Sequence, residues 1–333
     1  MYPDKIFYEP AVLHYELGTK LREKFNTVPW IPIESHNNIE QLRKNENNQF
    51  AKMKQHLIIG VRKSLKYTPN HKVSDFLVPY TSSGCSAMCL YCYLVCNYNK
   101  CAYLRLFVNR EQMMAKLVKT AGASHKDIVF EIGSNSDLIL ENTITQNLEW
   151  TIEEFAKKEK GFLTFPTKFD MVEPLTPLNH KGRIIIRMSV NPQEIIRKIE
   201  FGTSPLSKRI DAINQMSTAG YKVGLLIAPV IMVENWKALY KELIEQLADQ
   251  LSEKTRKQLI IEIIFMTYSY VHRAINQDAF PNAVNLFDDK LMTGRGRGKY
   301  WYRQDIRTEG EEFLRKELSQ KLSDVPILYV TIF

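Results

Sequence analysis

Short apolar runs alternate with longer amphipathic segments over most of this chain, and this alternation restricts the possible folds more than any other feature. The pattern starts at Phe76 and is typical of repeated βα units. The run Ile184–Val190 is almost continuously apolar, as expected of a parallel strand that is covered on both faces. We therefore predict an α/β fold, an open, partial (β/α)6 barrel. Its predicted strands are Phe76–Tyr80, Ile128–Ile132, Phe162–Phe165, Ile184–Val190, Val223–Ala228 and Leu259–Phe265, and its predicted helices are Glu111–Ala121, most of Leu138–Lys158, Pro205–Ala219 and Trp236–Leu251.

Polar residues follow the predicted strands at their carboxyl ends. In barrels of this kind the chemistry collects at these ends, because the loops there meet on one face of the sheet. The sequence therefore predicts a site built from several separate segments. They are Thr81–Cys92, Gly133–Asp137, Thr167 with Lys168, Ser189 with Asn191, and Pro229.

Three cysteines, Cys85, Cys89 and Cys92, lie within eight positions directly after the first predicted strand. A structural zinc site usually takes four ligands from two distant CxxC pairs, whereas this CxxxCxxC spacing supplies three thiols from one loop. Three thiolates can hold a [4Fe-4S] cluster by three of its irons and leave the fourth iron open to a small molecule. The spacing resembles that of radical S-adenosylmethionine (SAM) enzymes, in which SAM takes the open iron. A zinc site and three unrelated buried thiols are the alternatives.

Composition narrows the class of protein without naming its partner. The chain has 333 residues, of which 44% are hydrophobic, so it can bury a sizeable core. No apolar run approaches the ~20 residues of a membrane span, and the opening residues lack the order of a secretory signal, so we expect a cytoplasmic protein without a membrane partner. The formal charge of +8 suits a polyanionic partner, but a basic surface that serves solubility explains it equally well.

The two ends of the chain differ from the alternating middle. We predict an N-terminal α/β extension over residues 1–72, the partial barrel over 73–270 and a C-terminal hairpin, helix and strand over 271–333. Residues 293–303 combine glycines, cations and aromatic side chains. Glycines allow close approach of the backbone, cations bind phosphates and aromatic rings stack on bases, so this segment is a candidate for nucleic-acid binding. A plain hairpin with a basic, exposed tip is the alternative.

With these features placed, the sequence resembles the spore photoproduct lyase family of radical SAM enzymes, over most of its length. The order and spacing of many short matches make the resemblance specific. Beside the three cysteines they include Ser35-His36-Asn37, Ile59-Gly60-Val61-Arg62-Lys63, Tyr91-Cys92-Tyr93-Leu94, Phe130-Glu131, Thr167-Lys168-Phe169, Gly202-Thr203-Ser204-Pro205-Leu206, Lys208-Arg209-Ile210, Ala219-Gly220-Tyr221, Ala228-Pro229 and Gly298-Lys299-Tyr300.

The resemblance implies a partial barrel of the radical SAM type and the repair of 5-thyminyl-5,6-dihydrothymine, the thymine dimer of spore DNA. In the family, a reduced [4Fe-4S] cluster cleaves SAM to a 5′-deoxyadenosyl radical. This radical removes the C6 hydrogen of the lesion, the bridge between the bases breaks, and a hydrogen atom returned by the protein leaves two thymines. The implied partners are lesion-bearing DNA and an electron donor such as flavodoxin or ferredoxin. We expect the protein to be a monomer and to lie in the spore core, which is the cytoplasm of the spore.

The resemblance also assigns roles to residues of this chain. The cluster ligands would be Cys85, Cys89 and Cys92. Residues expected to contact SAM are Ser134, Ser136, Asp137, Lys168, Ser189 and Asn191, although Ser189 and Asn191 could instead cap the next helix. Residues expected to hold the extruded lesion and its phosphates are Arg295, Lys299 and Tyr300.

The sequence departs from the family at the residue that donates the final hydrogen atom. The family has a cysteine in the Phe-Glu motif, whereas this chain has Ser134, and an O–H bond is too strong to give up hydrogen readily to a carbon radical. We expect Cys96, or else Cys101, to be the donor, with Tyr93 as the relay to SAM. The alternative is that both cysteines are ordinary buried thiols.

Two other functions stay open. One is a related radical SAM enzyme that acts on another nucleic acid or on a peptide. The other is a non-catalytic nucleic-acid-binding protein with a structural metal.

Overall fold

The computed structural model describes residues 2–97 and 103–332, which form two compact units. Unit 1 consists of Met1–Ser86, Leu94–Thr167 and Pro177–Ile185, and unit 2 consists of Ala87–Tyr93, Lys168–Thr176 and Ile186–Phe333. The predicted division at residues 72/73 and 270/271 stays a prediction.

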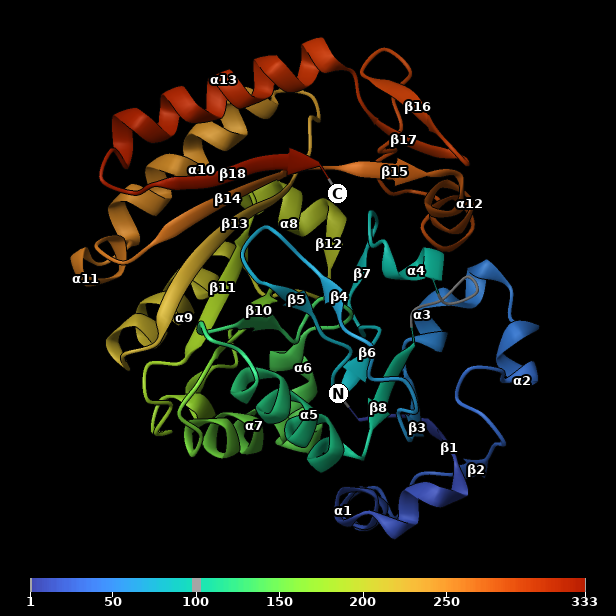
Figure 1. Ribbon diagram of the computed structural model, residues 1–333. Helices are drawn as coiled ribbons and strands as arrows, with labels where there is room; N and C mark the ends of the chain where they lie inside the picture. Colours follow the sequence, from blue (N-terminus) through green and yellow to red (C-terminus); the bar gives the residue numbers. More distant parts are fainter. Residues whose placement is uncertain (1, 98–102, 333) are drawn as a thin grey trace. The chain divides into compact units, whose positions relative to one another are not determined.

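The main sheet has eight strands in the order β18-β14-β13-β11-β10-β9-β5-β4 (Figure 1). The strand order does not close into a ring, which confirms the predicted partial barrel, and each of the six predicted barrel strands is present in the sheet. Neighbouring strands are parallel in β5/β9, β9/β10, β13/β14 and β14/β18, while the edge strand β4 is antiparallel to β5. The strand β11 (Ile184–Val190) is buried along nearly its whole length, as its apolar sequence predicts.

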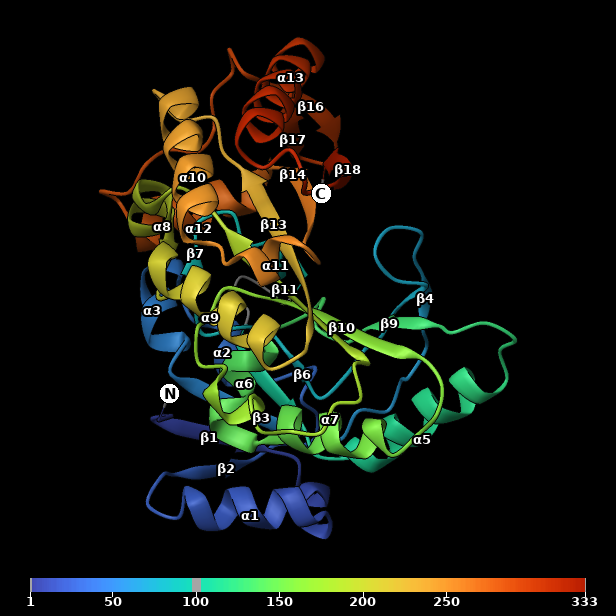
Figure 2. The same ribbon diagram turned by 90° about the vertical axis from the view of Figure 1, so that its left-hand side faces the viewer.

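Unit 1 contains a second sheet, with five strands in the order β2-β1-β3-β8-β6, whose strand order the sequence did not predict. Its core includes Ile6, Leu57 and Leu104 from three neighbouring strands, and Leu21 from α1. Figure 2 shows α1 lying along this sheet. The elements of unit 1 are β1 (Lys5–Tyr8), η1 (Pro10–His14), α1 (Glu16–Lys24), β2 (Trp30–Pro32), α2 (Glu40–Arg43), η2 (Asn47–Gln49), α3 (Phe50–Met53), β3 (His56–Gly60), β4 (Thr68–Pro69), β5 (Phe76–Leu77), β6 (Ser82–Ser83), α4 (Leu94–Asn97), β8 (Leu104–Phe107), α5 (Arg110–Gly122), β9 (Val129–Glu131), α6 (Leu138–Thr145), α7 (Asn147–Ala156) and β10 (Phe162–Thr167).

Unit 2 carries the C-terminal strands of the main sheet and a separate small sheet, β15-β17-β16. The helices α10 and α13 pack against each other beside β14 and β18 (Figure 1), with Trp236 and Phe313 in edge-to-face contact at 5.2 Å between ring centroids. The elements of unit 2 are β7 (Met88–Cys89), η3 (Glu173–Leu175), most of β11, α8 (Gln193–Ile199), β12 (Glu200–Phe201), α9 (Leu206–Thr218), β13 (Lys222–Val230), α10 (Trp236–Gln250), α11 (Glu253–Arg256), β14 (Ile260–Phe265), β15 (Thr267–Ser269), α12 (Tyr270–Ala279), β16 (Met292–Gly296), β17 (Lys299–Tyr302), α13 (Gln304–Lys321) and β18 (Ile327–Ile332).

The predicted helix over residues 138–158 is divided into α6 and α7. Gln146 adopts a left-handed backbone conformation, with φ of 54°, and so ends α6. The side-chain oxygen of Asn142 then accepts hydrogen bonds from the amides of Leu148 at 3.0 Å and Glu149 at 3.2 Å, which fixes the start of α7. A helical hydrophobic period continues across this break, so the pattern alone predicted a single helix.

Candidate functional site

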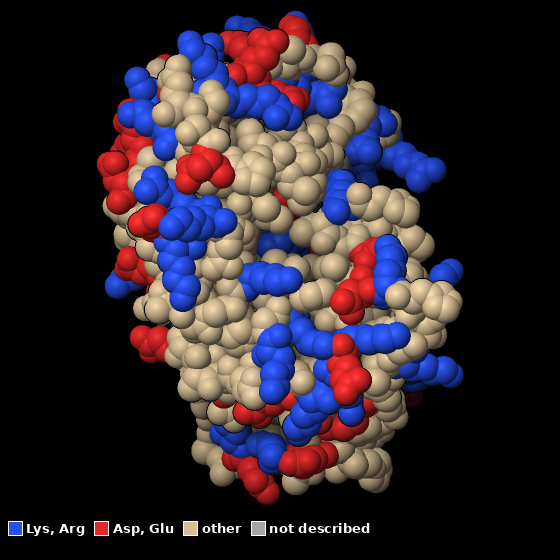
Figure 3. Space-filling model, turned by 60° about the vertical axis from the view of Figure 1, so that its left-hand side comes forward, with Lys and Arg blue, Asp and Glu red and all other residues tan. Residues whose placement is uncertain are grey.

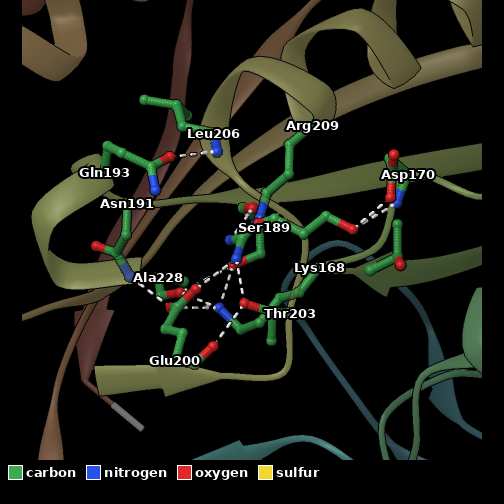
Figure 4. A network of polar contacts seen from close by, with 12 residues as sticks. Lys168, Asp170, Ser189, Asn191, Gln193, Glu200, Thr203, Leu206, Arg209 and Ala228 are labelled. Carbon is green, nitrogen blue, oxygen red and sulfur yellow. Dashed lines mark hydrogen bonds and ion pairs between the residues drawn. The ribbon is translucent and has the colours of Figure 1, made fainter. Parts of the chain in front are cut away.

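Lys168 is the centre of a polar network in unit 2, directly after β10 (Figure 4). Its ammonium donates hydrogen bonds to Ser189 Oγ at 2.7 Å, to Glu200 Oε1 at 2.9 Å and to the carbonyl oxygen of Ala228 at 3.0 Å. Three predicted strand ends, after β10, on β11 and on β13, therefore contribute to one site. The network retains some solvent access, because the Lys168 side chain is 20% exposed.

Glu200 is the acceptor that most of this network shares, and its side chain is fully buried. Arg209 Nη2 donates to its Oε2 at 2.7 Å, and Asn191 Nδ2 donates to its Oε1 at 2.8 Å. The hydroxyl of Tyr91 also donates to Oε1. Glu200 thus connects Tyr91, between Cys89 and Cys92, to the side chain of Lys168.

Opposing effects act on the ionisation of Glu200. Burial alone would raise the pKa of its carboxyl, but the positive charges of Lys168 and Arg209, with the hydrogen bonds of Tyr91 and Lys168, hold it well below the ordinary value. The pKa of Tyr91 is shifted far upward, first by burial and then by the negative charges of Glu200 and Cys89. Glu200 is therefore a carboxylate and Tyr91 a neutral hydrogen-bond donor at neutral pH.

Two further predicted residues, Ser189 and Asn191, belong to this network. Ser189 Oγ donates to the carbonyl of Ala228 at 2.9 Å, and Asn191 Oδ1 accepts from the hydroxyl of Tyr240 at 2.9 Å. Neither side chain caps α8, whose N-cap residue is Pro192 and which has no side-chain cap. The structure thus brings Lys168, Ser189 and Asn191 together, as one common site requires.

The other three residues predicted to contact SAM follow β9 in unit 1. Ser134 lies half-buried in a turn, and Ser136 forms a bridge to Gly84 and a hydroxyl hydrogen bond with Ser82. Asp137 is the N-cap of α6: its Oδ1 accepts from the amide of Ile139 at 3.1 Å. Asp137 therefore has a structural role in α6, as an N-cap aspartate commonly does.

Gly84 and Cys85 of the cysteine segment are held by residues of unit 1. Lys54 donates from Nζ to the carbonyl oxygen of Cys85 at 2.7 Å. Gly84 has φ of 82°, and an ideal Cβ there would lie 1.8 Å from the carbonyl oxygen of Tyr103, so only glycine fits. Arg62 donates to the carbonyl of Ser82 at 3.2 Å, which fixes the backbone just before this turn.

Cys89 and Cys92 lie in unit 2. Cys89 is in β7 and is the register partner of Glu200, and the amide of Cys92 donates to the carbonyl of Cys89 at 3.0 Å. Within the described part of the chain, the thiols of Cys85, Cys89 and Cys92 form no disulfide, and each of these residues is partly exposed. No three His, Cys, Asp or Glu residues among those described converge on a point where a single metal ion could bind.

The glycine-rich segment forms a hairpin of β16 and β17, with Gly296-Arg297-Gly298 at its tip and positive φ at all three residues. Arg295 is exposed and lies over the ring of Trp301, with 4.8 Å from Cζ to the ring centroid. Lys299 is exposed, and Tyr300 packs edge-to-face against Phe287 at 4.8 Å. The hairpin thus presents cations and aromatic rings together on β16 and β17, although its contact with DNA stays a prediction.

The residues predicted for hydrogen return are described only in part. The side chain of Tyr93 is 40% exposed. Cys96 lies in the short helix α4, but its side chain is outside the described part of the chain. Cys101 lies entirely outside the described residues. Their predicted roles stay predictions.

Sequence reasoning missed Glu200, and it gave no role to Tyr91, Arg209 or Lys54. The sequence does contain an indication of Glu200, since it is a single acidic residue between two apolar residues, Ile199 and Phe201. Tyr91, between two cysteines, left a signal only through its neighbours. Lys54 had none, because a lysine beside polar residues is usually solvated.

Lysine and arginine side chains lie among aspartate and glutamate side chains on the face drawn in Figure 3, so the excess positive charge does not form one continuous patch there. Among the described residues, no helix is both long and apolar enough to cross a membrane.

Comparisons with known proteins agree over nearly the whole chain. The family model described as Spore photoproduct lyase matches residues 1–331. The spore photoproduct lyase of Bacillus subtilis (strain 168) is 31% identical over 99% of this chain and 98% of its own length. That of Geobacillus sp. (strain Y412MC61) is 30% identical with the same coverage.

Solved structures of spore photoproduct lyases have the same fold. A complex with dinucleoside spore photoproduct matches with a TM-score of 0.91 and 28% identity over 99% of both chains. A double mutant with bound AdoMet and dinucleoside spore photoproduct matches with a TM-score of 0.91 and 29% identity over 99% of both chains.

Proposed function

Because this chain belongs to the spore photoproduct lyase family, we propose that it is a radical SAM lyase that reverts spore photoproduct in DNA to two thymines. The observation that carries the proposal is the family match over residues 1–331, which includes the CxxxCxxC segment. The solved neighbours that hold dinucleoside spore photoproduct, in one case with AdoMet, support both the substrate and the cofactor.

The donor set of the cysteine segment fits a [4Fe-4S] cluster. Cys85, Cys89 and Cys92 offer three thiols that are not joined in disulfides and are partly exposed. Each thiolate of a cubane cluster binds a different iron, so the thiols need not converge on the position of one ion. When both are bound, the cluster and SAM supply the one-electron chemistry that begins the reaction.

Lys168, Ser189 and Asn191 would bind SAM, with Ser134 and Ser136 at a neighbouring strand end. The support is the network around Glu200, which holds the Lys168 ammonium and the Ser189 hydroxyl 2.7 Å apart. The positive charge of Lys168 would attract the carboxylate of SAM, and a hydrogen bond to that carboxylate would replace one of the three that the ammonium donates here. Asp137 would act on SAM only indirectly, since its carboxylate caps α6.

The hairpin of β16 and β17 would bind the lesion. Arg295 and Lys299 would contact phosphates, and Tyr300 would stack on an extruded base. The exposure of both cations, with aromatic rings packed next to them, supports this role. A damaged dimer is less costly to extrude than normal bases.

The returned hydrogen atom would come from Cys96, or else from Cys101, through Tyr93. The support is chemical: Ser134 stands where the family has cysteine, and an S–H bond yields hydrogen far more readily than an O–H bond. A Cys96→Ala variant is expected to slow repair and to form by-products, measured by liquid chromatography of the digested DNA. Repair at the normal rate without by-products would remove Cys96 from the reaction.

The remaining parts of the proposal concern the setting. The protein would act as a monomer in the cytoplasm of the spore and would take electrons from a flavodoxin or a ferredoxin.

Iron analysis after anaerobic purification tests the cofactor. We expect a brown protein with about four irons per chain, which loses its iron when Cys89 is replaced by alanine. A colourless protein that binds zinc would instead favour a structural metal in a nucleic-acid-binding protein.

A further inference from the structure

The helix α12 starts directly after β15, the strand that pairs with the hairpin strand β17 (Figure 1). In this pairing Tyr268 is the partner of Tyr300, and Ser269 is the partner of Lys299. Ser269 also caps α12, because its Oγ accepts a hydrogen bond from the amide of His272 at 3.4 Å. The strand pair that carries Lys299 and Tyr300 therefore fixes the start of α12.

One face of α12, with His272 and Asn276 one turn apart, contacts the segment that carries two of the cysteines. Asn276 Nδ2 donates to the carbonyl oxygen of Leu90 at 2.8 Å and also to the hydroxyl of Tyr268 at 3.0 Å. The ring of His272 hydrogen-bonds the backbone of Cys92 and stacks on Tyr268, with the ring centroids 5.1 Å apart. His272 is only 4% exposed, so these contacts are shielded from water.

The same segment has backbone hydrogen bonds that can report on its rigidity. The amide of Leu90 donates to the carbonyl of Ile199 at 3.0 Å, and the amide of Cys92 donates to the carbonyl of Cys89 at 3.0 Å. An amide exchanges its hydrogen with solvent only when such a bond opens. Exchange at Leu90 and Cys92 therefore measures how firmly residues 88–92, the cysteine loop, are held.

We propose that Asn276 and His272 are positioning residues that connect the lesion-binding hairpin to the cysteine loop, so that binding of the lesion makes this loop more rigid. The inference rests on the proposed function, because it takes the hairpin as the place where the lesion binds. Tyr268 is the link: its backbone pairs with Tyr300, while its hydroxyl and ring contact the two residues on α12.

The physical requirement is that the lesion favours one state of this link. A ligand shifts an equilibrium only by its difference in affinity for the two states. A lesion held by Lys299 and Tyr300 orders β17 and its partner β15, and so favours the state in which α12 is docked on the cysteine loop. The cysteine loop would then be more ordered with substrate bound than without it, and the radical chemistry would begin in this ordered state.

Hydrogen–deuterium exchange of the iron-loaded protein tests this proposal. The protein is measured with an undamaged oligonucleotide and with the same oligonucleotide carrying the lesion. In the wild type we expect the lesion to slow exchange at Leu90 and Cys92 about fivefold, the factor that one additional hydrogen bond of ordinary strength provides.

Two variants break the link, and one is a matched control. Asn276→Asp keeps the size of the side chain but cannot donate to the carbonyl of Leu90. Tyr268→Phe removes only the hydroxyl that Asn276 contacts, and serves if the first variant does not fold. Both are expected to lose the lesion-dependent slowing, whereas Gln277→Ala, an exposed change on the same helix, is expected to keep it.

The proposal would be overturned if the lesion slowed exchange in both Asn276→Asp and Tyr268→Phe as much as in the wild type. It would also be overturned if the lesion did not slow exchange in the wild type. A merely structural role of Asn276 would speed exchange with both oligonucleotides and leave their ratio unchanged, which also counts against the proposal. Thymine is measured in the same samples. A wild type that shows the slowing but forms no thymine contradicts the proposed reaction and leaves the link intact.

Discussion

At the scale of single residues, Glu200 organises the site in unit 2 by accepting hydrogen bonds from side chains of four different segments. Its carboxylate is fully buried between Lys168 and Arg209, and it also accepts from Tyr91 and Asn191. A buried charge of this kind is stable only while its partners are in place. The identity of Glu200 thus determines the positions of residues that the sequence assigned to SAM.

The variant Glu200→Gln is expected to lower the free energy of unfolding by about 3 kcal/mol, because it leaves the buried Arg209 and the partly buried Lys168 without a carboxylate. Urea-induced unfolding followed by circular dichroism measures this change. The matched control is Glu194→Gln, which breaks the exposed ion pair with Lys198 and is expected to leave the midpoint nearly unchanged. Equal midpoints for the two variants would show that the Glu200 network does not stabilise unit 2.

At the scale of elements, the tip of the hairpin of β16 and β17 contains two glycines with positive φ, Gly296 and Gly298. Gly298 has φ of 67°, and an ideal Cβ there would lie 2.2 Å from the ring of Tyr270. Gly294, in the same hairpin, has open space around it and no positive φ. Alanine variants at Gly298 and Gly294 therefore distinguish the effect of backbone strain from the effect of adding a methyl group to the hairpin.

We expect Gly298→Ala to destabilise the protein by about 1 to 2 kcal/mol, from the left-handed backbone, and to displace the exposed ring of Tyr270. It should also weaken binding to a lesion-bearing oligonucleotide, measured by fluorescence anisotropy. Gly294→Ala is expected to change neither quantity. Similar behaviour of the two variants would mean that the hairpin tip does not need its observed conformation.

The elements also show what the sequence could predict. Apolar runs such as Ile184–Val190 identified the barrel strands, because a strand buried on both faces needs a continuous apolar sequence. An N-terminal α/β extension was expected, but the five strands of the second sheet in unit 1 and their pairing were not predicted, because the strands are short and pair across long separations, as β3 does with β8. The division at Gln146 was missed because it depends on a backbone conformation that the hydrophobic period does not encode.

The candidate site, like the fold, was predicted only in part. Residues at strand ends, such as Lys168 and Ser189, could be found because the fold brings strand ends together. Glu200 and Asn276 were not given roles, since their links to the cysteine-bearing segment are contacts with residues about 110 and 190 positions earlier in the chain.

At the scale of the whole molecule, stability should depend on pH through buried groups. Burial alone would raise the pKa of Glu9, but the amides of Val61 and His36 and the ring of His36 lower it. Burial lowers the pKa of His36 below its ordinary value. Both groups have a lower pKa in the folded state than in the unfolded state, so their contribution to stability is present above the unfolded values and is lost as pH falls.

The urea midpoint of the wild type is therefore expected to fall from pH 7 towards pH 4. His36→Gln should flatten the part of this decline that begins near about pH 6.5, where an unfolded histidine takes up its proton. His71→Gln, at an exposed position, is the control and should follow the wild type. An unchanged slope in His36→Gln would exclude His36 as a source of acid sensitivity.

The central claim is that this chain repairs spore photoproduct by means of its three-cysteine segment. The most direct measurement is the yield of thymine from a lesion-bearing oligonucleotide after anaerobic incubation with SAM and a reductant. The wild type is expected to convert the lesion to thymine, and Cys89→Ala to convert none. Cleavage of SAM by the wild type with the lesion left intact would contradict the claim and would indicate a different substrate.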